Sequence, residues 1–115
     1  MSLDHLQREI EQFAVDRDWV QFHTVRSLIL AIQAEVGELA EVVQWIPDGD
    51  IDDAWLDTNR ERLSEEWADV FIYLLRLATV AGIEPERAAL AKIRLNADKY
   101  PVDKAKGNAR KYSEL

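Results

Sequence analysis

Two short acidic motifs lie inside runs of apolar residues, and each contains two carboxylates three positions apart. The first is Glu35-Val36-Gly37-Glu38, and the second is Glu66-Trp67-Ala68-Asp69. On a helix, residues three apart share a face, so each motif directs two carboxylates to one side. Charges among apolar neighbours are costly to bury unless something pairs with them. Four converging carboxylates are therefore typical of a divalent-cation site, and Mg²⁺ is the first candidate because it prefers oxygen ligands.

A simpler interpretation is that these acids are solvated or salt-bridged, as most single Glu-x-x-Glu pairs are. Arg62, four positions before Glu66, is the one basic residue with helical spacing to either motif. The ligand types also limit the metal. All-carboxylate sites suit Mg²⁺, with Mn²⁺ as a possible substitute, whereas di-iron bundles use Glu-x-x-His pairs. Neither His5 nor His23 follows a glutamate by three residues, so iron chemistry is not expected.

Composition predicts one helical globular domain over residues 1–115, with residues 101–115 as a basic tail. The chain has no cysteine, which excludes disulfides and thiolate chemistry. Its formal charge of −8 argues against binding a nucleic-acid polymer. Seven of the 14 basic residues fall after position 91, so one end could still meet a small polyanion. We expect a cytosolic protein with no membrane contact, because no long apolar run and no signal peptide is evident.

Hydrophobic periodicity and capping residues predict an all-α fold. We expect helices over residues 4–16, 24–45, 58–81 and 85–99, with a connector at 18–23 and an exposed acidic loop at 48–57. In the third helix, from Trp67 to Ala81, only Asp69 and Arg76 are charged. A helix that is apolar nearly all round is buried on several sides, which in so short a chain predicts packing against another subunit.

Aromatic and amide side chains near these helices are candidates for binding a nucleotide. Trp19 and Trp45 flank the first acidic helix and could stack on a base, although core packing is the alternative for each. Lys92, Asn96 and Tyr100 recur at spacings of four, on one helical face. They form either a row of donors for phosphate and base or an ordinary solvated stripe, and their spacing does not decide between the two.

The order of these motifs resembles that of the MazG-like nucleoside triphosphate pyrophosphohydrolases, and most closely their dCTP pyrophosphatase branch. The resemblance extends from about Phe13 to the last residue. It rests on Trp19-x-Gln-Phe-His23, Glu35-Val-Gly-Glu38-Leu-Ala-Glu41, Gln44-Trp45, Glu65-Glu66-x-x-Asp69-Val, Ile72-Tyr73-Leu74, Lys92, Asn96, Tyr100-Pro101 and Arg110-Lys-Tyr-Ser-Glu-Leu115.

This resemblance implies a four-helix all-α bundle that forms a homodimer, or a tetramer of two dimers. It also implies Mg²⁺-dependent cleavage of a (deoxy)nucleoside triphosphate to the monophosphate and pyrophosphate, for nucleotide-pool control or house-cleaning. The metal-binding, catalytic carboxylates would be Glu35, Glu38, Glu66 and Asp69. The nucleotide pocket would contain Trp19, Trp45, Tyr73, Lys92, Asn96 and Tyr100, with Phe22 and His23 nearby.

One departure concerns the base. The eukaryotic branch has a histidine in the base pocket where this chain has Ile10. A related branch that acts on dUTP, a broad specificity, and a non-catalytic helical oligomerisation module are the alternatives to a dCTP enzyme.

In the mechanism that the residues permit, water attacks the α-phosphorus, and Lys92, or Arg110 and Lys111 of a neighbouring subunit, receive the pyrophosphate.

Overall fold

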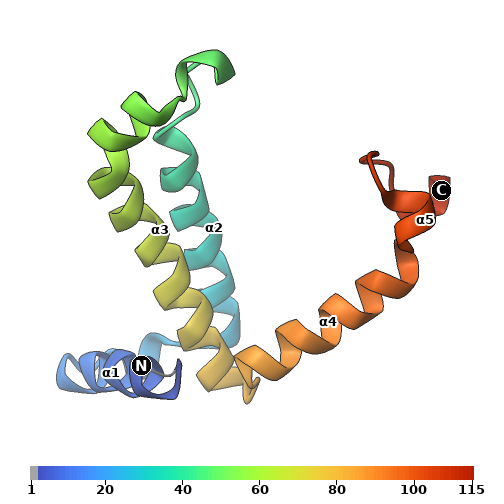
Figure 1. Ribbon diagram of the computed structural model, residues 1–115. Coiled ribbons are helices and arrows are strands. Elements are labelled where there is room, and N and C mark those ends of the chain that lie inside the picture. The colour runs from blue at the N-terminus through green and yellow to red at the C-terminus, as the bar shows by residue number, and fades with distance from the viewer. Residues whose placement is uncertain (1–2) are drawn as a thin grey trace. The chain divides into compact units, whose positions relative to one another are not determined.

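The computed structural model describes residues 3–115, and within that range every regular element is helical (Figure 1). The all-α prediction is therefore confirmed for the described chain. The elements are α1 (Leu3–Asp16), η1 (Val20–Phe22), α2 (Val25–Glu41), η2 (Asp48–Asp50), α3 (Asp53–Ala81), α4 (Pro85–Lys99), α5 (Val102–Ala105) and η3 (Tyr112–Glu114), where η marks a 3₁₀ turn.

The chain divides into two compact units, the first ending at Gly82 and the second comprising Ile83–Leu115. In the first unit, α2 and α3 run side by side, and α1 packs against α3 (Figure 1). The second unit contains α4, α5 and η3. The single domain predicted from composition remains a prediction, as do the four-helix bundle and the subunit assembly that the resemblance implies.

The buried apolar side chains of the first unit come from all three of its long helices. Leu28 and Val42 lie on α2, Leu75 and Ala78 on α3, and Ala14 on α1. Their spacing places them on the faces where the helices meet. The α2–α3 contact is therefore fixed by a narrow apolar seam, and residues flanking that seam lie at the open edge of the helix pair.

The start of α2 is determined by a local cap. The Thr24 side chain accepts a hydrogen bond from the Ser27 backbone N–H, with 3.1 Å between Oγ1 and N. This bond satisfies one of the donors that a helix N-terminus leaves unpaired. The predicted start is confirmed, whereas α2 ends at Glu41 rather than near Trp45. Hydrogen-bonded turns continue the chain to Ile46.

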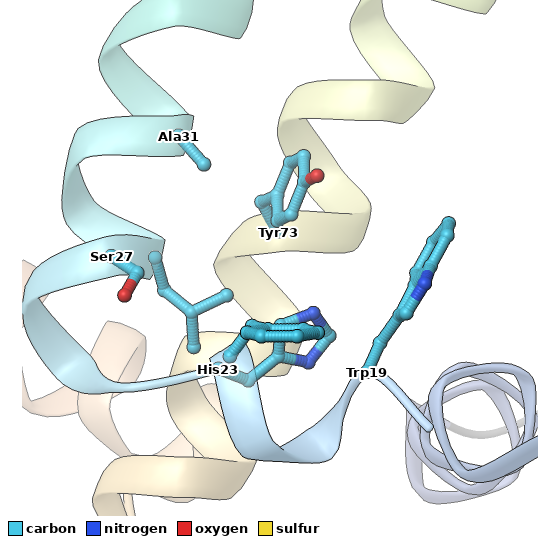
Figure 2. A pocket seen from close by; sticks show the side chains of 7 residues that line it. Trp19, His23, Ser27, Ala31 and Tyr73 are labelled. Atoms are coloured by element: carbon cyan, nitrogen blue, oxygen red, sulfur yellow. The ribbon is translucent and has the colours of Figure 1, made fainter. Parts of the chain in front are cut away.

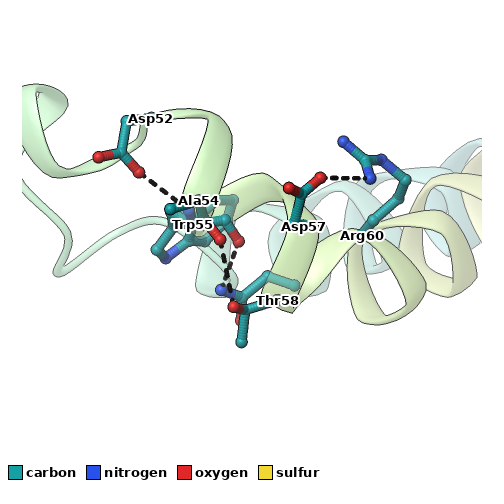
Figure 3. A network of polar contacts seen from close by, with 7 residues as sticks. Asp52, Ala54, Trp55, Asp57, Thr58 and Arg60 are labelled. Atoms are coloured by element: carbon teal, nitrogen blue, oxygen red, sulfur yellow. Dashed lines mark hydrogen bonds and ion pairs between the residues drawn. The ribbon is translucent and has the colours of Figure 1, made fainter.

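The start of α3 corrects the prediction of a loop over residues 48–57. The helix begins at Asp53, because the Asp52 carboxylate accepts from the Trp55 backbone N–H at 2.9 Å and caps it (Figure 3). Arg60 then pairs with Asp57 at 2.9 Å on the first turns of the helix. Part of the expected acidic loop is thus the first turn of α3, where aspartates interact favourably with the helix dipole.

The other end of α3 and the start of α4 follow the sequence signals. Gly82 has φ of 70°, the left-handed conformation that ends a helix at low cost for glycine. Pro85 occupies the first turn of α4, and the Glu84 side chain caps that helix through the Arg87 backbone N–H. Both boundaries were predicted.

The region after α4 is more structured than a polar tail. It contains α5 and η3, and the ring of Tyr100 meets that of Tyr112 edge-on with centroids 6.1 Å apart. The Lys99 ammonium lies 4.8 Å from the centre of the Tyr112 ring.

None of the helices described is long and apolar enough to span a membrane.

Candidate metal and nucleotide site

The four predicted carboxylates lie together where α2 and α3 run side by side. One carboxylate oxygen from each of Glu35, Glu38, Glu66 and Asp69 can be chosen so that all four lie within 4.8 Å of one another. Each helix contributes one inner and one outer acid. Glu35 and Glu66 are partly buried, whereas Glu38 and Asp69 are exposed. The cluster is therefore walled by protein on one side and open to solvent on the other.

The electrostatics of this cluster show a site short of positive charge. Burial, followed by a hydrogen bond that protonated Glu35 donates to the Glu38 carboxylate and by the negative charges of Glu38, Asp69 and Glu66, raises the pKa of Glu35 to about 7. The Oε2 atoms of Glu35 and Glu66 are buried without a hydrogen-bond partner. Within residues 3–115, no ion pair neutralises any of the four acids. Arg62, the one basic residue at helical spacing, does not pair with Glu66.

The geometry fits a small divalent cation. In an octahedral Mg²⁺ site with bonds of about 2.0–2.1 Å, ligand oxygens lie about 3–4 Å apart. The 4.8 Å spread of the carboxylate oxygens is close to that range and requires only small side-chain shifts. A cation there would also provide the missing partner for the two buried Oε2 atoms. Carboxylate oxygens are ligands that suit hard metals such as Mg²⁺ and Mn²⁺.

A cavity of about 330 Å³ lies one helical turn away from the carboxylates (Figure 2). Ala31, one turn before Glu35 on α2, and Tyr73, one turn after Asp69 on α3, both line it. Its other lining residues are Trp19, Phe22, His23, Ser27 and Leu28. The walls are mostly apolar and aromatic, with a few polar atoms, as in pockets that hold flat organic ligands.

Four residues of the predicted pocket therefore share this cavity. Trp19, Phe22 and His23 come from the connector between α1 and α2, and Tyr73 comes from α3 (Figure 2). A second cavity, of about 70 Å³, adjoins it and shares three lining residues, Trp19, His23 and Tyr73. Ile10, the departure from the eukaryotic pattern, lines this smaller space.

Sequence reasoning missed some lining residues, most clearly Ser27 and Ala31. They precede Glu35 by eight and four positions, so they lie on the same face of α2. Small side chains at successive turns beside an acidic motif leave open space, and that pattern was available in the sequence. Arg76, which lines the smaller cavity, was visible as a lone basic residue in the apolar part of α3.

The remaining predicted residues are not brought to this cavity within the first unit. Trp45 follows the end of α2 and is 85% exposed. The others are exposed residues of the second unit, and their part in the pocket remains a prediction. They are Lys92, Asn96, Tyr100, Arg110 and Lys111.

Comparison with known proteins identifies the family. The MazG-like family profile matches residues 30–115, and the chain belongs to this family. It is 43% identical to dCTP pyrophosphatase 1 of Homo sapiens and to that of Bos taurus. Each match covers 99% of this chain and 68% of the relative.

A solved structure extends the likeness to the fold. A pyrophosphatase from Archaeoglobus fulgidus superposes with a TM-score of 0.80 at 38% identity, covering 85% of this chain and 91% of the other. The resemblance drawn from the motifs is thus confirmed, and so is the MazG-like all-α fold class.

Proposed function

We propose that this protein is a nucleoside triphosphate pyrophosphohydrolase that cleaves its substrate to the monophosphate and pyrophosphate, with attack at the α-phosphorus. The observation that carries the proposal is the convergence of four unpaired carboxylates one helical turn from an aromatic cavity. The first feature suits a cation and phosphates, and the second suits a base. The relatives are named dCTP pyrophosphatase and pyrophosphatase, and these names fit a site that binds phosphates next to a site that binds a base.

Glu35, Glu38, Glu66 and Asp69 would hold the metal ion. Bound there, Mg²⁺ would neutralise triphosphate charge and increase the acidity of a water nucleophile. The residues supply the complementary electrostatics. Without a cation, Glu35 keeps a proton up to about pH 7, because its ionised form is partly removed from water and lies beside three other acids. Binding of a cation would release that proton and ionise the carboxylate.

The base would bind in the 330 Å³ cavity, between the aromatic residues Trp19 and Tyr73. Stacking on large rings is tolerant of base identity, so hydrogen-bonding residues must provide any preference. dCTP, or a modified dCTP, is the substrate we propose first, because the curated relatives named above are dCTP pyrophosphatases. A dUTP-type or broad specificity is the alternative.

The remaining predicted residues would act on the phosphates and the outer part of the nucleotide. In this proposal Lys92, or Arg110 and Lys111 of a neighbouring subunit, receive pyrophosphate, since they add positive charge to an acidic protein. From the resemblance we expect Asn96 to offer a donor and an acceptor to the base edge, and Tyr100 and Trp45 to take part in nucleotide binding.

We also propose that the protein self-associates into a homodimer or a tetramer of two dimers. Large apolar side chains are exposed along the helices of the first unit, among them Leu30 at 57%, Trp67 at 55% and Leu74 at 46%. Exposed apolar side chains in such number are typical of a surface that another chain covers. A second copy would bury them and could present its own basic residues to the site.

Product identification tests the reaction. The protein is incubated with dCTP and Mg²⁺, and the products are separated by ion-exchange chromatography. We expect dCMP and pyrophosphate in equal amounts, and no turnover when EDTA replaces Mg²⁺. Orthophosphate with dCDP would contradict cleavage at the α–β bond. A panel of triphosphates with different bases, at equal concentration, then separates a dCTP enzyme from a dUTP-type or broad one.

The rival from another class is a non-catalytic helical module that uses the same acids for salt bridges. Thermal melts with and without Mg²⁺ and a non-hydrolysable dCTP analogue distinguish the two. An enzyme of the proposed kind is stabilised by the pair of ligands, since ligands that bind only the folded state raise the melting temperature. Melts that are indifferent to both ligands would favour the module.

A further inference from the structure

Arg76 is a buried arginine on α3 whose shortest contact is with a histidine. Only 4% of it is exposed, and its Nε donates a hydrogen bond to Nδ1 of His23 at 3.0 Å. The nearest carboxylate oxygen, of Glu11, lies 3.8 Å from Nη1, and that nitrogen is buried without a hydrogen-bond partner. Burial of a guanidinium is costly, so its position against His23 needs an explanation beyond a loose ion pair.

This contact determines which ring nitrogen of His23 carries the proton. Arginine has donors only, so Nδ1 of His23 must act as the acceptor and be unprotonated. The proton of the neutral ring then lies on Nε2. Desolvation, and secondly the charge of Arg76, lower the pKa of His23 from its ordinary value of 6.5, which keeps the ring neutral near pH 7.

The His23 side chain lines the cavity in which we propose that the base binds. His23 lines the larger cavity together with Trp19 and Tyr73 (Figure 2), and the same three residues also line the smaller cavity. Arg76 bonds to Nδ1, and within residues 3–115 Nε2 of His23 has no hydrogen-bond partner. A donor without a protein partner at the wall of a mostly apolar cavity is available to a ligand.

We propose that Arg76 is a positioning residue that fixes His23 as the Nε2–H tautomer, so that His23 gives the pocket one oriented donor for an acceptor atom of the base. The acceptor would be a carbonyl oxygen or an unprotonated ring nitrogen. The part that concerns the base rests on the proposed function, whereas the tautomer does not. Ile10 lines the smaller of the two cavities that His23 shares and offers no hydrogen bond, so His23 adds a polar contact where the Ile10 side chain provides none.

Nitrogen-15 NMR of the histidine side chains tests the tautomer without any turnover. The chain has two histidines, so His5→Gln assigns both ring systems. At pH 7.5 we expect His23 to show a pyridine-type Nδ1 and a pyrrole-type Nε2. In Arg76→Met the two nitrogens should move toward averaged tautomer values. Arg76→Gln should keep the wild-type pattern, since its amide can donate to Nδ1. A mixed tautomer in the wild type, or no change in Arg76→Met, overturns the proposal.

Steady-state kinetics test the effect on recognition. Loss of one oriented hydrogen bond in Arg76→Met should raise KM for the triphosphate by about 3- to 10-fold, with kcat changed less than about twofold. Arg76→Gln should restore most of the loss. Glu11→Gln, which removes the 3.8 Å ion pair and leaves the His23 contact, should match the wild type. An equal fall of kcat in Arg76→Met and Glu11→Gln would show a purely structural role and overturn the proposal.

These two measurements separate the possible failures. If wild-type protein hydrolyses no triphosphate but shows the fixed tautomer, the proposed function fails and the positioning of His23 stands. If turnover is normal and the tautomer is mixed, the positioning fails and the proposed function stands. Thermal unfolding followed by circular dichroism checks that each variant is folded under the conditions of the two measurements.

Discussion

At the scale of single residues, the acidic cluster depends on which carboxylate of a neighbouring pair faces inward. Glu66 is partly buried in the cluster, whereas the adjacent Glu65 is exposed and outside it. The two side chains have the same length and charge and differ by one position, about 100° around the helix. They therefore form a matched pair that separates a role in the site from an effect of net charge.

Glu66→Gln is expected to weaken Mg²⁺ binding and turnover strongly, and Glu65→Gln to leave both close to wild type. Removal of one carboxylate ligand takes away charge stabilisation worth several kcal/mol, so kcat should fall by at least about 100-fold. Calorimetric titration with Mg²⁺ and an initial-rate assay measure the two effects. Comparable losses in both variants would mean that net charge, and not ligation, determines the activity.

The raised pKa of Glu35 predicts how the stability of the metal-free protein depends on pH. The folded form keeps a proton up to about pH 7 that the unfolded chain releases near 4.5. Between these values the unfolded state binds fewer protons, so the free energy of unfolding falls as pH rises. The loss should be at most about 1 kcal/mol between pH 5.5 and 7.5, because solvent screens a partly exposed carboxylate.

Urea unfolding in EDTA at several pH values measures this slope. Glu35→Gln should flatten it, because an amide does not titrate in this range. Glu41→Gln, an exposed residue of the same helix, should leave it unchanged. His23, whose pKa is lowered by folding, contributes a slope of the opposite sign in all three proteins, so the slopes are compared between proteins. A slope in Glu35→Gln equal to that of the wild type would show that Glu35 does not titrate in this window.

At the scale of elements, local signals predicted some helix ends and not others. Thr24, Gly82 and Pro85 each occupy a position that favours one residue type, and the corresponding boundaries were correct. The start of α3 was missed because several aspartates follow one another there, and any of them could cap a helix. The choice of Asp52 depends on the bond its carboxylate makes with the Trp55 backbone N–H.

Asp52→Ala should destabilise the protein by about 1 kcal/mol, since it removes the cap of the longest described helix. Asp53→Ala is the matched control, because Asp53 lies in the first turn without capping the helix. Its loss should cost only the smaller helix-dipole contribution of about 0.3–1 kcal/mol, at the lower end for an exposed residue. Thermal or urea unfolding compares the two. A larger loss of stability in Asp53→Ala than in Asp52→Ala would show that Asp52 is not the residue that caps α3.

The site shows the same division between local and long-range information. Helical spacing alone placed Glu35 beside Glu38 and Glu66 beside Asp69, and the packing of α2 on α3 brought the pairs together. The hydrogen bond between Arg76 and His23 joins residues 53 positions apart. No periodicity within one helix predicts such a contact, because it depends on how the connector after α1 lies against α3.

At the scale of the whole molecule, the exposed apolar residues predict that the chain does not act alone. The side chains buried within the first unit form a narrow seam, and Trp67 stacks on Phe71 at a centroid distance of 5.0 Å while more than half exposed. The apolar character of α3, seen in the sequence, predicted a subunit contact. The oligomer itself remains a proposal.

Sedimentation velocity should show a species heavier than the 13.2 kDa chain. Leu74→Glu would place a charge in the proposed interface and raise the dissociation constant by about 100-fold or more. Ser64→Glu, at an exposed polar position of the same helix, is the control and should leave the assembly intact. A monomeric wild type at micromolar concentration would contradict the self-association that we propose.

The proposed activity depends on Glu35, Glu38, Glu66 and Asp69 together binding a divalent cation that in turn binds a triphosphate. A crystal structure with Mn²⁺ and a non-hydrolysable dCTP analogue tests it most directly, because Mn²⁺ is located by its anomalous scattering. We expect an anomalous peak about 2.0–2.2 Å from oxygens of these carboxylates and also within bonding distance of phosphate oxygens. A fully liganded crystal in which the four side chains are splayed apart, or paired with basic residues and without a peak between them, would contradict it.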